Sequence, residues 1–218
     1  MPASELVKEM DGIQDALRPV LKEKGFKCRG RTFNRVTEDG LTQVINFQMG
    51  SSDPPGTTYI PGLRENLYGL FTVNLGIYIP EVAELHEGGP AKAWVREYHC
   101  SIRARLGNAS GSTQDICWHV RGTPDVVQDV QSLLVIFGFV FLDRFSSRDL
   151  ILAELKGHGD NLVHCAVPRI VSAIILAKRG NSAAARALLT AQSLEVRHNR
   201  HHPAYVRQLA QRMGLGDI

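Results

Sequence analysis

The sequence lacks the signatures of the most familiar catalytic and metal-binding sites. Its 218 residues include four cysteines, at positions 28, 100, 117 and 165, with no Cys-x-x-Cys pair among them. It contains no phosphate-binding loop, Gly-x-Gly-x-x-Gly fingerprint, Gly-x-Ser-x-Gly nucleophile elbow or His-Glu-x-x-His motif. We therefore expect no cofactor and no resident metal ion. The cysteines are expected to be free thiols in a reducing cytoplasm, with a disulfide as the alternative.

A secretion signal and a long apolar run are also missing. The N-terminus is acidic and amphipathic, whereas a signal peptide has a basic start followed by an apolar stretch. The longest apolar run, residues 133–142, is far shorter than the ~20 residues that cross a bilayer. We expect this run to lie in the core, and the protein to be cytoplasmic with no membrane partner.

The sequence has no large excess of charge of one sign, because its formal net charge is only +3. Residues 157–218 nevertheless carry eight Lys and Arg against three Asp and Glu, so the basic character belongs to the C-terminal part. The hydrophobic content of 44% is that of an ordinary globular protein with a core. This length and composition predict one large domain, or one domain with an appendage.

The strongest element is the stretch Phe-Thr-Val-Asn-Leu-Gly-Ile-Tyr-Ile-Pro at 71–80. Its odd positions are all apolar, and this period of two predicts a strand with one side in the core. Asn74 and Gly76 are poor strand formers inside it. We interpret the stretch as the central strand of an antiparallel sheet, with its second face free for a role other than packing.

Periodicity and turn residues predict the other elements. An amphipathic helix over 4–24 has Ser4 as its N-cap and Gly25 as its stop. Strands follow at 26–36, 41–49, 98–106 and 116–120, with a hairpin turn at Glu38-Asp39-Gly40 and a long loop at 50–66. Tyr98 is expected to point inward. Helices are predicted from Thr123 onward and at 146–157, 168–179, 182–194 and 203–214.

This order predicts an α+β fold. Residues 1–157 would form a domain with an antiparallel sheet of four or five strands, one face of which is covered by the N-terminal helix. Residues 158–218 would form a C-terminal helical extension packed on that domain, with a helical hairpin about Gly180-Asn181.

Several motifs in order resemble the bacterial family catalogued as domain of unknown function 4304. They are Lys-Gly-Phe-Lys at 24–27, Arg-Thr-Phe-Asn-Arg at 31–35, Gln-Val-Ile-Asn-Phe-Gln at 43–48 and Phe-Thr-Val-Asn-Leu-Gly-Ile at 71–77. His-Cys-x-Ile-Arg-x-Arg-Leu-Gly at 99–107, followed by Asp115 and Trp118, is similar to the family's later segment. That segment tends towards paired tryptophans in the family, and Cys117 stands here where one is expected. The resemblance covers roughly residues 5–155. It implies a fold type and a bacterial source, and no established activity or catalytic residues.

The second face of the predicted sheet collects amide, hydroxyl and guanidinium groups. An arginine offers a planar fork that suits a carboxylate or a phosphate. One hypothesis is that this face binds an acidic small ligand or a protein partner with an acidic surface. The alternative is a solvated or covered sheet face with its amides bonded internally. The residues of the face are Asn46, Gln48, Thr72, Asn74, Tyr78, His99, Ser101, Arg103 and Arg105, and the predicted binding residues are these without Thr72 and Ser101.

Three other kinds of site are weaker hypotheses. An enzyme would need His99, Arg103, Arg105 and Asp115 to converge in one pocket. The run His-Asn-Arg-His-His at 198–202 could bind a metal ion or be a solvated turn. Nucleic acid could bind the basic C-terminal helices through Arg197, Arg200, Arg207 and Arg212, but no base-reading motif accompanies them.

The sequence therefore favours a binding protein without chemistry of its own. A more specific hypothesis is a protein that neutralises a toxin or another protein partner, engaged by the polar sheet face and the 50–66 loop.

Overall fold

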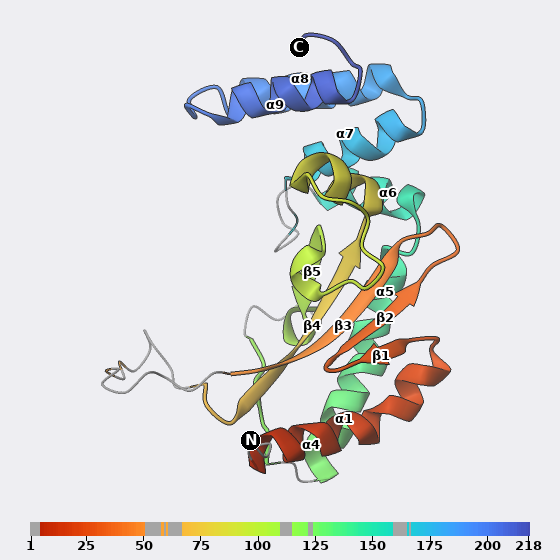
Figure 1. The fold of residues 1–218 in the computed structure, drawn as a ribbon, viewed down its shortest axis with the longest axis vertical. Helices are drawn as coiled ribbons and strands as arrows, with labels where there is room; N and C mark the ends of the chain where they lie inside the picture. The colour runs from red at the N-terminus through yellow and green to blue at the C-terminus, as the bar shows by residue number, and fades with distance from the viewer. Residues whose placement is uncertain are drawn as a thin grey trace. The chain divides into compact units, whose positions relative to one another are not determined.

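The computed structural model describes residues 5–50, 58, 60, 67–109, 115–121, 124–158, 165 and 167–218. The fold is α+β, as predicted, with an N-terminal helix, an antiparallel sheet and a series of C-terminal helices (Figure 1). Ser4, Thr123 and nearly all of the 50–66 loop lie outside the described residues.

The sheet contains six strands among the described residues. Its order is β1-β2-β3-β4-β5, and the short strand β6 also pairs with β4. β4 is therefore an interior strand, as predicted. The strands are β1 (Lys27–Arg29), β2 (Thr32–Val36), β3 (Thr42–Met49), β4 (Leu70–Tyr78), β5 (Ile102–Arg105) and β6 (Trp118–His119).

Helices precede, interrupt and follow the sheet. They are α1 (Glu5–Glu23), α2 (Pro80–Val82), α3 (Leu106–Ala109), α4 (Pro124–Leu133), α5 (Phe139–Arg144), α6 (Arg148–His158), α7 (Pro168–Lys178), α8 (Ser182–Glu195) and α9 (His202–Arg212). Two π-helical turns, η1 (Ala83–Glu87) and η3 (Leu134–Gly138), and one 3₁₀ turn, η2 (Glu97–His99), complete the described elements.

Contacts within the chain group into two compact units, each assembled from three segments. The first unit comprises Met1–Arg35, Val44–Leu75 and Ala104–Leu142. The second comprises Val36–Gln43, Gly76–Arg103 and Asp143–Ile218. The units therefore alternate along the chain. The predicted boundary between residues 157 and 158 stays a prediction.

β4 is buried on both of its faces. The apolar odd positions are fully covered, as the alternation predicts. Thr72 and Asn74, at 6% and 4% exposure, are covered as well. The expectation of a free second face on this strand is therefore wrong. Thr72 and Asn74 can be buried because each finds a hydrogen-bond partner, which removes most of the cost of taking a polar group out of water.

The hairpin at Glu38-Asp39-Gly40 is confirmed. The backbone N–H of Thr37 donates to the carbonyl of Leu41, and Gly40 has φ +75°. Glycine takes this left-handed conformation without the steric cost that a Cβ would bring.

Three of the predicted strands differ from their expected bounds, and the 116–120 strand is reduced to β6 at residues 118–119. The 26–36 strand is wrong as one element, because a turn at Gly30, with φ +58°, divides it into the hairpin partners β1 and β2. The start of the 98–106 strand is wrong too: η2 occupies its first residues and Tyr98 is 63% exposed. His99 stabilises that turn because its Nδ1 accepts a hydrogen bond from the backbone N–H of Arg96.

The C-terminal helices pack within the second unit. α7 and α8 form the predicted antiparallel hairpin, where Gly180 has φ +81° and the side chain of Asn181 caps α8 by accepting from the N–H of Ala184. α7 also contacts α2, and α9 contacts both α8 and η1 (Figure 1). The helices after residue 167 therefore rest on the segment that directly follows β4.

The apolar run at 133–142 is only partly core. Leu134, Phe139, Phe141 and Leu142 are buried, whereas the large side chains of Val135, Ile136 and Val140 are exposed. When an apolar run is continuous, it places apolar side chains on every side of its helix, and only one of these sides can pack against the rest of the protein. Among the described helices, the stretch Pro124–Arg144 is long and apolar enough to cross a membrane by length and composition alone.

Candidate functional site

The seven predicted binding residues divide between the two units. Asn46, Gln48, Asn74 and Arg105 belong to the first unit, and Tyr78, His99 and Arg103 belong to the second.

In the first unit, Asn74 and Gln48 form a hydrogen-bonded amide pair. Asn74 Nδ2 donates to Gln48 Oε1 over 2.8 Å. Asn74 is buried in β4, whereas Gln48 in β3 is exposed. The buried amide therefore fixes the orientation of the exposed one: one lone pair of the Gln48 oxygen accepts this bond, and the NH₂ group of Gln48 keeps two donors.

Arg105 lies beside this pair and forms an ion pair with Asp115. The two side chains are 39% and 38% exposed, so water screens the pair and leaves part of the guanidinium accessible. Gln48 and Arg105 line one shallow pocket of about 40 Å³, together with Thr72 and Cys117. We call Gln48, Asn74, Arg105 and Asp115 the amide–arginine site.

Asn46 has an internal role. Its Nδ2 donates to the carbonyl of Arg31 and to Oγ1 of Thr32, which ties β3 to the turn between β1 and β2. Its amide is thus engaged within the fold.

In the second unit, Tyr78, His99 and Arg103 each contact nearby segments. Tyr78 is buried, and its hydroxyl accepts a hydrogen bond from the backbone N–H of Lys92. Arg103 pairs with Glu97 at 2.9 Å. Burial, followed by the charges of Lys92 and Arg96, lowers the pKa of His99, so its ring is neutral at physiological pH. The enzyme hypothesis needs His99 and Arg103 to meet Arg105 and Asp115 of the first unit, and it stays a prediction.

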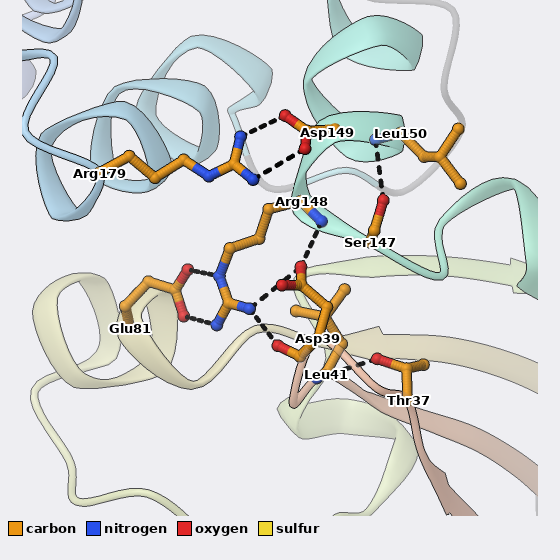
Figure 2. Close-up of polar contacts among 9 residues, drawn as sticks. All are labelled: Thr37, Asp39, Leu41, Glu81, Ser147, Arg148, Asp149, Leu150 and Arg179. Atoms are coloured by element: carbon orange, nitrogen blue, oxygen red, sulfur yellow. Dashed lines mark hydrogen bonds and ion pairs between the residues drawn. The ribbon is translucent and has the colours of Figure 1, made fainter.

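A charged cluster that sequence reasoning missed joins three segments of the second unit (Figure 2). Arg148 donates from Nε and Nη2 to the two carboxylate oxygens of Glu81, over 2.6 and 2.8 Å. Its Nη1 also donates to the carbonyl of Asp39, while the Asp39 carboxylate accepts from the Arg148 backbone N–H at 2.6 Å. Such a bidentate fork holds both partners in one geometry. The cluster binds the β2–β3 turn and α2 to the start of α6, and its role is structural.

A second unpredicted cluster lies between η1 and α9. His86 Nδ1 and the hydroxyl of Tyr205 share a hydrogen bond, although 119 positions separate them in the sequence. The ring of His202 packs edge-on against the ring of Tyr205. Arg212 is close enough to act electrostatically on both His86 and Tyr205. His202 and Arg212 each belong to a tract noted in the sequence, but nothing local signals His86.

The 198–202 tract forms the turn between α8 and α9. Asn199 Oδ1 accepts from the backbone N–H groups of His201 and His202, as in an ordinary polar turn. Within the described part of the chain, no three His, Cys, Asp or Glu side chains come together in a way that could hold a metal ion.

The four cysteines, all among the described residues, carry thiols. Burial raises the pKa of the Cys165 thiol to about 12, so this group stays protonated and is a poor nucleophile at neutral pH.

Comparison with protein families finds a match to a single segment of the chain. Residues 64–134 match the family described as Domain of unknown function (DUF4304). This match confirms the resemblance over those residues, which include β4, β5, Asp115 and Trp118. The earlier motifs, at 24–27, 31–35 and 43–48, lie outside the matched segment. No curated protein and no solved structure matches the chain.

Asn74, Arg105 and Asp115 lie within the DUF4304 segment, whereas Gln48 lies before it. The His86–Tyr205 contact joins this segment to α9, beyond its end.

Proposed function

We propose that the protein is a non-enzymatic binding protein of the bacterial cytoplasm, and that its amide–arginine site contacts an acidic surface of a protein partner. A specific form of the proposal is a protein that neutralises a toxin. The single observation that carries it is that Gln48 and Arg105, both accessible and both hydrogen-bond donors, line one pocket.

The donor character follows from the Asn74–Gln48 bond. Because one lone pair of the Gln48 amide oxygen accepts the bond from Asn74, the NH₂ group of that side chain keeps two donors. A guanidinium likewise carries donors and no acceptor. A surface with two donors and one positive charge favours a partner rich in carboxylates.

The Arg105–Asp115 pair supports an exchange on binding. In the protein alone, Asp115 supplies a carboxylate to Arg105 in a half-exposed position. An exposed ion pair of this kind contributes only about 0.2–1 kcal/mol, so a partner carboxylate that excludes water can replace Asp115 at small cost. Because a ligand must displace Asp115 from Arg105, groups that bind the arginine more weakly than Asp115 does are excluded.

The proposal is tested by affinity capture from a native bacterial lysate, comparing the wild-type protein with Arg105→Glu as bait. Arg18→Glu is the matched control, because Arg18 is also an exposed arginine of the first unit paired with an aspartate, Asp15. We expect a protein that the wild type and Arg18→Glu retain and Arg105→Glu loses. Gln48→Ala should weaken retention by a smaller factor.

Two outcomes would contradict the proposal. The first is that Arg105→Glu retains the same proteins as the wild type. The second is that no protein is retained while native mass spectrometry of the wild type shows a small acidic metabolite, since that result would indicate an acidic small ligand instead.

A further inference from the structure

The second unit contains a wide, open pocket between η1 and α9. Its volume is about 750 Å³, and its lining is His86, Gly88, Tyr205, Gln208, Gln211 and Arg212. Pockets that hold small molecules measure ~300–1,000 Å³ in surveys of proteins. The pocket therefore has room for a small molecule that is larger than a single inorganic ion.

Helical spacing brings the α9 side chains to one wall. Tyr205, Gln208 and Arg212 are three and four positions apart, so they follow one another along the same face of the helix. His86 stands on the opposite wall, in the π-helical turn η1. Gly88, with φ +75°, ends that turn and lets the backbone leave it.

His86 and Tyr205 line this pocket, and the ring of His202 packs against Tyr205. His86 and Tyr205 share a hydrogen bond, and the rings of His202 and Tyr205 lie 6.0 Å apart. His202 Nε2 is buried and has no hydrogen-bond partner among the described residues.

Arg212 is the positively charged residue that lines this pocket. Among the side chains that the structure describes, none forms an ion pair with Arg212. Glu84, in η1, pairs with Lys178, and the Asp217 carboxylate accepts a hydrogen bond from the lining residue Gln211. The positive charge of Arg212 also reaches His86 and contributes to lowering its pKa, after burial itself.

We propose that this pocket binds a small molecule carrying an oxyanion, a phosphomonoester or a carboxylate, with the anionic group at Arg212 and Tyr205. The guanidinium supplies the charge and two parallel donors, which is the geometry that both kinds of oxyanion accept. The amides of Gln208 and Gln211 are placed to contact the polar remainder of the ligand. The site lies wholly in the second unit and does not depend on the amide–arginine site.

The experiment measures binding of glycerol phosphate, inorganic phosphate, citrate and a short single-stranded DNA by isothermal titration calorimetry. The variants are Arg212→Gln and its matched control Arg207→Gln. Both arginines are exposed on α9, and Arg207 does not line the pocket. The helix tolerates either change, because the replaced side chains point outward.

We expect glycerol phosphate or citrate to bind the wild type. Arg212→Gln should weaken that binding by about 10-fold or more, because it removes the positive charge and the charge-assisted hydrogen bonds to the oxyanion. Arg207→Gln should stay within about twofold of the wild type. Preference for glycerol phosphate identifies a phosphomonoester, and preference for citrate identifies a carboxylate.

Other results would overturn the proposal. They are no binding of any small anion, or equal loss in the two arginine variants. DNA binding that depends equally on both arginines, with no small-anion binding, would show a general basic surface instead. A second readout reports where the ligand sits: the ring NMR signals of His86, which lines the pocket, should shift when glycerol phosphate or citrate saturates the wild type, and unchanged signals at saturation would contradict the proposal.

Discussion

Replacing Arg148 with alanine should lower the free energy of unfolding of the second unit by about 3 kcal/mol. The Glu81 side chain is only 8% exposed, and Arg148 is its bidentate partner. Removing one member of a buried pair costs ~3–5 kcal/mol, because the remaining charge stays buried without a partner. Arg148 itself is 19% exposed, so water offsets part of this cost and the lower end of the range applies.

The matched control is Arg179, at the end of α7, whose partner Asp149 follows Arg148 on α6. Asp149 pairs with Arg179, but the two side chains are 75% and 38% exposed (Figure 2). Water screens this exposed pair, so Arg179→Ala should shift the unfolding midpoint far less than Arg148→Ala does. Urea unfolding followed by far-ultraviolet circular dichroism measures both changes as shifts of the transition midpoint.

A double variant separates the charge effect from loss of packing. Arg148→Met with Glu81→Leu removes both charges and keeps apolar bulk, so it should be more stable than Arg148→Ala alone. The reasoning would be refuted if Arg148→Ala and Arg179→Ala had the same midpoint. It would also fail if the double variant were no more stable than the single one.

Three further predictions concern single positions. Gly76→Ala should destabilise the protein by ~1–3 kcal/mol in the same urea assay, because a Cβ at this position would lie 2.6 Å from Cys100 Sγ and 2.8 Å from Cys100 Cβ. The control is Gly12→Ala on α1, which has open space around it and should be neutral or stabilising. Asn181→Ala should cost ~1 kcal/mol through loss of the α8 cap, and Asn181→Asp should restore most of it. Burial, and then the charges of Arg212 and His202, lower the pKa of His86 below its ordinary value. The neutral ring therefore contributes its full stability above about pH 6.5, and this contribution is lost as the pH falls through the folded-state pKa. Between about pH 7.5 and about pH 5.5, the unfolding midpoint of His86→Gln should fall less than that of the wild type. An equal fall in wild type and His86→Gln would contradict that assignment.

The parts of the fold that could be predicted are those encoded within a few residues of one another. The period of two at 71–80 located β4, Asp39-Gly40 located the hairpin, and Gly180-Asn181 located the turn between α7 and α8. In each of these cases a local pattern determines a local conformation. The turn at Gly30 escaped prediction because Gly30-Arg31 carries weaker turn chemistry than Asp39-Gly40.

The sites could be predicted only in part, because they depend on contacts between distant segments. Alternation along β4 predicts which side is apolar, but it does not reveal that the amide of Asn74 meets Gln48 and is buried. His86 and Tyr205 likewise meet only because η1 packs against α9. Arg148 is an unremarkable helix-start residue in the sequence, and its importance follows from Glu81, 67 positions away.

The alternation of the two units along the chain has a practical consequence for anyone expressing pieces of this protein. Each unit is assembled from three separate segments, so no single stop codon or start site yields one unit intact. A gene fragment that ends at residue 157 would keep Val36–Gln43 and Gly76–Arg103 but discard α7, the partner of α2, and α9, the partner of η1. The apolar surface left on those short elements would favour aggregation. Expressing the missing helices from a second gene in the same cell should recover soluble protein.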